Sequence, residues 1–220
     1  GMSELQQSGR LAVVFLNSTL RLAGYRSDPT NEEADVFKVP VSAADVAVGR
    51  RAAVWGLDDD ARDANVMDGT DQLYVSYQGD DDRLVVDCFG DAVQSGATRI
   101  ASNYFYISNE GDLRCVRNTF DTPLTSNTAS STNADSLITG VNDMQVLYGI
   151  DSTPDNGVVE INRYVSAAQV LANGGWSGVR SLRITLDVES ESDVVRPANS
   201  GDPMEPISRA FEITVTLRNR

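Results

Sequence analysis

The first 25 residues constrain the fold most, because they combine a helical hydrophobic period with a clear stop signal. Large apolar residues recur along one stripe that centres on Leu11, Phe15 and Leu22 and is widened by Leu5, Val14, Leu16 and Leu20. Gly24 is placed to end the helix in a left-handed conformation, and Pro29 prevents an early restart. Ser3 with Gln6 makes only a weak cap at the start. We therefore expect a half-buried helix that is the second part of a longer one.

The chain beyond this helix is patterned for strands. Apolar and polar residues alternate, or apolar runs are bounded by turn residues, over residues 71–77, 84–89, 103–108, 112–117, 141–150, 158–164, 179–189 and 210–217. A short helix is predicted over residues 166–173. Further short strands beside the long helix are predicted around Val36, Phe37, Val39, Val41, Val46 and Val48. One helix followed by many strands predicts the α+β class, with the helix packed on an antiparallel β-sheet.

Several segments are predicted to be loops. Residues 119–136 are rich in Ser, Thr and Asn, residues 151–157 form a strong turn, and residues 197–206 carry three prolines. Residues 27–65 show no sustained period, and the chain has no internal repeat.

The charge of the chain limits its partners. A net charge of −14 argues against nucleic acid, which needs clustered Lys and Arg, and against simple adsorption to an anionic membrane. With 41% hydrophobic residues the chain can bury a core, yet no run approaches the roughly 18 to 20 apolar residues of a membrane-spanning helix.

The absence of histidine excludes much of enzyme chemistry. Ser-His and Cys-His nucleophile pairs, His-ligated zinc and an imidazole proton shuttle all require it. The abundant carboxylates cluster in turns such as residues 58–60 and 80–82, which is typical of solvated loops. No phosphate-binding glycine loop occurs, and residues 174–178 read as a loop anchored by Trp176. We therefore expect neither an enzyme nor a cofactor.

A calcium site and an aromatic platform are the remaining candidates for ligand binding. Asp151, Thr153 and Asp155 have partial EF-hand spacing, but Gly157 falls one place late and Asn162 stands where a bidentate Glu is needed. An acidic hairpin turn is the better interpretation. Residues 104–106 could stack nucleobases, although cross-strand packing suits so acidic a chain better.

The two cysteines, Cys88 and Cys115, allow two interpretations. Without histidine they cannot form a structural zinc site. They are buried free thiols if the protein is cytosolic, or a disulfide if it is exported. A bond would close a loop of roughly 27 residues and contribute about 3 to 4 kcal/mol.

Four segments carry a family resemblance. They are residues 5–25 (LQQSGRLAVVFLNSTLRLAGY), residues 68–77 (DGTDQLYVSY), residues 140–151 (GVNDMQVLYGID) and residues 211–220 (FEITVTLRNR). In their residues and in their order along the chain, these segments resemble PilW-type minor pilins of type IV pili. The resemblance covers nearly the whole chain, except for residues 27–65.

The resemblance implies a structural protein with no covalent chemistry. Residues 1–25 would be the C-terminal half of the pilin helix, and residues 26–220 a β-rich head that forms one domain with it. A membrane anchor would precede the helix, holding the head in the periplasm before assembly into an extracellular pilus. An exported head favours the Cys88–Cys115 disulfide. The partners would be other minor pilins and the major pilin, with Leu5, Gln6 and Leu11 as the predicted subunit contacts.

Within this family the expected role is priming of pilus assembly, at or near the tip, in support of twitching motility and cell adhesion. Two alternatives stay open. A type II secretion pseudopilin of the GspJ kind shares the same plan, and a periplasmic calcium- or glycan-binding module would use the acidic loops.

Overall fold

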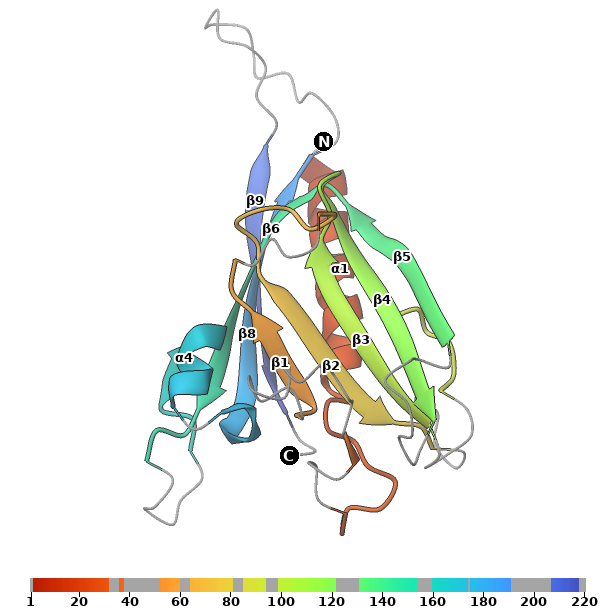
Figure 1. Ribbon diagram of the computed structural model, residues 1–220. Helices are drawn as coiled ribbons and strands as arrows, with labels where there is room; N and C mark the ends of the chain where they lie inside the picture. The colour runs from red at the N-terminus through yellow and green to blue at the C-terminus, as the bar shows by residue number, and fades with distance from the viewer. Residues whose placement is uncertain are drawn as a thin grey trace, which may run out of the picture.

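The computed structural model describes residues 2–31, 36–37, 52–59, 64–80, 85–93, 99–121, 131–153, 160–173, 175–190 and 207–217. These residues form one long helix, α1 (Met2–Leu20), and two antiparallel sheets (Figure 1). The first sheet has the order β1-β2-β3-β4-β5, with bounds Val54–Leu57, Gln72–Gln78, Arg99–Ile107, Asp112–Asp121 and Ser131–Thr139. The second has the order β7-β6-β8-β9, with bounds Arg163–Val165, Val141–Ile150, Val179–Glu189 and Ser208–Thr216. A short helix α4 (Ala167–Ala172) and a 3₁₀ turn (Trp176–Gly178) lie between β7 and β8.

The predicted strands over residues 71–77, 103–108, 112–117, 141–150, 179–189 and 210–217 are confirmed, each within a few residues. Their alternation reflects burial on one face of a sheet. In β8 the apolar residues Leu182, Ile184 and Leu186 are fully buried, while Arg183 and Thr185 between them are half-buried. The predicted short helix is confirmed as α4.

The two sheets are joined at a bend between β5 and β6. β5 ends at Thr139 on the edge of the first sheet, and β6 starts at Val141 in the second. Gly140 between them has a φ of +72°, which favours glycine. Its carbonyl accepts a hydrogen bond from Glu189 N–H at 2.7 Å, so the bend is held by β8. The prediction of a single sheet is therefore wrong, because this bend starts a second sheet.

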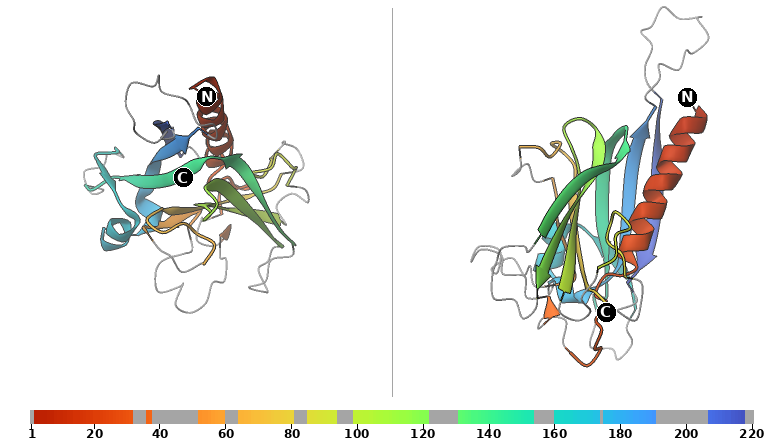
Figure 2. Two further views of the ribbon diagram at one scale, coloured as in Figure 1. Left: turned by 90° about the horizontal axis from the view of Figure 1, so that it is seen from above. Right: turned by 90° about the vertical axis from the view of Figure 1, so that its right-hand side faces the viewer.

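Helix α1 packs against both sheets. It contacts β9 and β8 of the second sheet and β5 of the first, and Figure 2 shows it running along β9 and β8. The main hydrophobic cluster joins buried residues of α1 with those of both sheets. The helix is therefore part of the core and not an appendage.

The end of the helix follows the predicted pattern. The α-helical residues stop at Leu20 and a turn continues to Gly24, whose φ of +73° is the expected left-handed conformation. Gly24 N–H then donates to Ser76 O at 3.0 Å, and Tyr25 O accepts from Gln78 N–H at 2.9 Å. The chain leaving α1 thus lies alongside the end of β2.

Three predicted segments differ from the structure. Of the predicted loop over residues 119–136, residues 119–121 belong to the end of β4 and residues 131–136 to β5. An edge strand exposed to water, such as β5, tolerates Ser, Thr and Asn. Residues 85–89 are a bridge and a turn, not a strand, because Val86 pairs back onto Ala92. Residues 160–162 precede β7 without joining it.

The region before β1 is described only in part. Val36 and Phe37 are not in a strand; both are buried, in a cluster with Ile100 and Phe120 of β3 and β4. Val39, Val41, Val46 and Val48 lie outside the described residues, as do residues 122–130 and 197–206. The division into residues 1–25 and 26–220 as one domain stays a prediction. Within the described part of the chain, no helix is long and apolar enough to cross a membrane.

Candidate assembly surface

The inner face of α1 combines leucines with small residues. Leu5, Ala12, Leu16 and Leu20 are buried, and Thr19 joins them. Gly9 lies so close to β9 that a Cβ atom there would come within 2.3 Å of the Phe211 ring. A glycine at the contact allows the helix backbone to approach the strand closely.

The predicted apolar stripe is right at Leu5, Leu16 and Leu20, which are buried, but its centre is misplaced. Leu11 and Val14 are 45% and 62% exposed, and Phe15 and Leu22 are half-buried. The stripe consists of large side chains alone, whereas the small residues Gly9, Ala12 and Thr19 complete the buried face. The face that remains outside therefore carries two large apolar side chains.

The outward-facing pair Leu11 and Val14 forms the α1 patch. These residues are three positions apart and so are neighbours on one face of the helix. Among the described residues, the other exposed large hydrophobic side chains are Leu147 in β6 and Leu171 in α4. Helix positions that face solvent usually carry polar or charged side chains. Two adjacent exposed apolar side chains therefore make the α1 patch a candidate contact surface.

The three predicted subunit contacts lie in different environments. Leu5 is 2% exposed and is held in the chain's own core, Gln6 is half-buried, and Leu11 is exposed in the α1 patch. The assignment of these residues to subunit contacts stays a prediction, and Leu5 is not accessible in this arrangement. Val14, which was not among them, is more exposed than any of the three.

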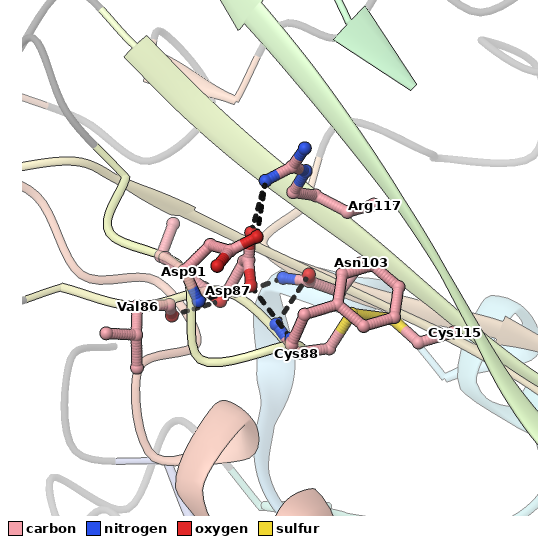
Figure 3. Close-up of polar contacts among 9 residues, drawn as sticks. Val86, Asp87, Cys88, Asp91, Asn103, Cys115 and Arg117 are labelled. Carbon is pink, nitrogen blue, oxygen red and sulfur yellow. Dashed lines mark hydrogen bonds and ion pairs between the residues drawn. A yellow bond between two sulfur atoms is a disulfide. The ribbon is translucent and has the colours of Figure 1, made fainter. Parts of the chain in front are cut away.

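The predicted disulfide is confirmed between Cys88, in a turn, and Cys115, in β4 (Figure 3). A buried chain of hydrogen bonds surrounds it. Asn103 Nδ2 donates to Tyr77 Oη at 2.9 Å, and Tyr77 in turn donates to the Val86 carbonyl at 2.7 Å. Cys88 N–H donates to Asn103 Oδ1 at 3.2 Å. Burial raises the pKa of the Tyr77 hydroxyl well above its ordinary value, so it remains a donor at any physiological pH.

An ion pair closes the same turn onto β4. Asp87 Oδ1 accepts the N–H groups of Phe89 and Asp91 at 2.8 and 3.0 Å, and Asp87 Oδ2 lies 2.5 Å from Arg117 (Figure 3). The Asp87 side chain is fully buried and that of Arg117 is 19% exposed. The disulfide and the ion pair together tie residues 85–93 to the first sheet.

Sequence reasoning missed this ion pair and the contact between Gly9 and Phe211. Asp87 directly precedes Cys88, and Arg117 follows Cys115 by two residues. Pairing the cysteines therefore brings the two charges to the same place, which was a usable signal. No comparable signal connects Gly9 with the far end of the chain.

The aromatic residues singled out in the sequence pack against other parts of the protein. Tyr104 and Tyr106 stack with each other across 4.8 Å, in a ladder that continues through Tyr74 to Trp55, which confirms cross-strand packing. Trp176 is 3% exposed and packs edge-on against Tyr148, as an anchor should.

The acidic turn after β6 is only partly described. Asp151 Oδ1 accepts the N–H of Thr153 at 2.8 Å, so this carboxylate shapes its own turn. Asp155 and Gly157 lie outside the described residues. No group of three acidic or cysteine side chains that could hold a metal ion occurs in the part of the chain that the structure describes.

Comparisons with known proteins agree with the resemblance read from the sequence. The family described as type IV pilus-assembly protein W, PilW, matches residues 102–219, more than half of the chain. The fold is similar to that of a type IV-like pilin from Thermus thermophilus, with a TM-score of 0.50, 13% sequence identity and 98% of each chain covered. At this identity the likeness shows the fold alone, which is pilin-like, with an N-terminal helix and antiparallel sheets. No curated protein matches the chain significantly.

Proposed function

Because the chain belongs to the PilW family of type IV pilus-assembly proteins, we propose that it is a minor pilin that enters the pilus through α1. The observation that carries this proposal is the division of α1 into two faces. One face is packed into the core, while the other presents Leu11 and Val14 to solvent. An apolar pair on an otherwise polar helix face is suited to burial against a helix of a neighbouring subunit.

The proposed mechanism is packing without covalent chemistry. Neighbouring subunits bury the α1 patch, and repetition of a head-to-tail contact produces a helical filament that need not close. The partners in this proposal are other minor pilins and the major pilin. Gln6, which is half-buried on the same helix, would lie at the edge of this contact.

The finer role that we propose is priming of pilus growth, with the protein at or near the tip. Before assembly the head would face the periplasm, held to the inner membrane by a segment that precedes α1. The family match favours a pilus over the related secretion machinery.

The test is complementation of a deletion strain of the source organism with the full-length gene. The variant Leu11→Asp/Val14→Asp should restore normal protein levels but few pili and little twitching, because it places charge in the subunit contact. Leu171→Asp is the matched control, since Leu171 is an exposed leucine on a different helix, 42% exposed, and its substitution should leave piliation unchanged. Normal pili with the α1 double variant would contradict the proposed contact. Normal pili in the deletion strain itself would contradict the assembly role.

A further inference from the structure

Asp71, immediately before β2, links the two sheets through its backbone and its side chain. Its N–H donates to the Met144 carbonyl of β6 at 2.8 Å, and its Oδ2 accepts the N–H of Val146 at 2.8 Å. Its Oδ1 accepts the N–H of Asp59, just after β1, at 3.2 Å. The residue is 6% exposed. One buried carboxyl group therefore connects β2 and the end of β1 with β6.

A second carboxylate extends this connection to α4. Asp58, next to Asp59, accepts the N–H groups of Ala167 and Ala168 at 2.7 and 2.8 Å. These are N–H groups of the first turn of α4, which have no partner within their own helix. We call Asp58 and Asp59 the β1 corner. It is held on one side by α4 and on the other by Asp71.

The charged groups that act on Asp71 all disfavour its ionised form. They are the carboxylates of Asp58, in the β1 corner, and of Asp143, in β6. Burial is the larger effect, and it raises the pKa of Asp71 to about 6 although the N–H groups of Val146 and Asp59 lower it. Tyr148 of β6 also faces this region. Its hydroxyl is buried and has no hydrogen-bond partner among the described residues. Burial, then Asp71 and Asp58, hold its pKa well above the ordinary value, so it stays neutral.

We propose that Asp71 is a protonation-controlled latch: as a carboxylate it holds the β1 corner on β6, and when it takes up a proton the corner loosens locally while the carboxyl group itself stays buried in the folded protein. A carboxylate accepts hydrogen bonds with both oxygens, whereas a carboxylic acid has one oxygen that carries a proton and donates. The protonated oxygen is the poorer acceptor, so the N–H bond to it weakens. The Asp59 N–H lowers the pKa of Asp71, so losing that bond while the carboxyl group stays buried raises the pKa further, and protonation therefore favours the loosened arrangement. The bond to Asp59 is the longer of the two, at 3.2 Å against 2.8 Å, and gives way first. Loosening at Asp59 then reaches the start of α4 through Asp58.

The test follows the amide resonances of the whole chain, labelled with ¹⁵N, between about pH 7.5 and pH 5. The resonances of Asp59 and Val146 should shift together with a shared midpoint at about pH 6, and hydrogen exchange at Asp59 should lose protection on the acid side. Asp71→Asn should abolish the shared transition. Asp151→Asn is the control, because Asp151 also accepts backbone N–H groups, those of Thr153 and Glu160, but none from the β1 corner or from β6, and it should leave the transition intact.

A direct measurement keeps the proposal falsifiable if the Asp71→Asn variant does not fold. The side-chain carboxyl carbon of Asp71 in the unmodified protein should titrate at about pH 6. Titration at the ordinary Asp value of about 4 would overturn the latch, as would amides of Asp59 and Val146 that do not move between pH 7 and 5. The same transition in Asp71→Asn would also overturn it.

Discussion

The ring of Phe211 in β9 lies directly on Gly9 of α1, with no room for a side chain at position 9. Alanine at position 9 would add about 1 kcal/mol of helix propensity, yet displacing the ring is expected to cost about 1 to 3 kcal/mol. Gly9→Ala should therefore destabilise the protein. In a Phe211→Ala background the clash is gone, and the same change should stabilise it. Denaturant unfolding of the four proteins measures both signs. Equal effects in the two backgrounds would show that the contact does not limit position 9.

Removal of the disulfide should lower stability through the unfolded chain. The cysteines are separated by 27 positions, and a loop of that size corresponds to about 3 to 4 kcal/mol of chain entropy. The expected result for Cys88→Ala/Cys115→Ala is a loss of that order in the free energy of unfolding. Reductant should destabilise the unmodified protein and have no effect on the double variant. A response of the double variant to reductant would contradict this account.

The ion pair between Arg117 and Asp87 should matter more than a surface pair. Asp87 is fully buried, and Arg117→Met would leave its carboxylate without a countercharge, at a cost of about 3 kcal/mol or somewhat more. Arg183→Met is the comparison, because Arg183 and Glu212 lie 4.0 Å apart and are 39% and 60% exposed. Its ion pair should be worth about 1 kcal/mol or less. Similar losses of unfolding free energy in the two variants would refute the difference.

Stability should depend on pH through Asp71. Its pKa of about 6 in the folded protein exceeds the ordinary value of 3.8, so the folded state binds this proton more tightly than the unfolded chain does. Stability from this group is therefore highest below about pH 4 and declines as the pH rises to about 6. The difference in unfolding free energy between the unmodified protein and Asp71→Asn should fall over that range and level off above it. A difference that is constant with pH would argue against a raised pKa.

Sequence patterns predicted most of the second sheet because the alternation of apolar and polar residues in its strands follows which side chains are buried. Leu182, Ile184 and Leu186 alternate with polar residues, and that period has one structural interpretation. β5 was missed because its residues lie at an exposed sheet edge, where Ser, Thr and Asn cost little. β1 was missed because four residues are too short for a period to be read.

The α1 patch shares Leu11 with the subunit contacts predicted from the sequence, but the sequence pattern did not single out Val14 as exposed or Gly9 as buried. Large side chains were assumed to face the core, although position 9 is occupied by glycine because Phe211 lies against it. That requirement comes from a strand 200 residues away, and no local pattern encodes it. Asp71 was missed for a similar reason, since its partners Asp59 and Val146 belong to other elements. Local patterns reveal which segments form elements, but not which elements meet.

The packing of α1 on β9 also bears on the order of folding. The first and last elements of the described chain are in contact, so the helix cannot acquire its complete binding face until the final strand has been made and has paired with β8. Contacts between the ends of a chain require the closure of its longest loop and are generally among the slow events of folding. A chain truncated before residue 208 would therefore leave α1 with β5 and β8 but without β9, its principal partner.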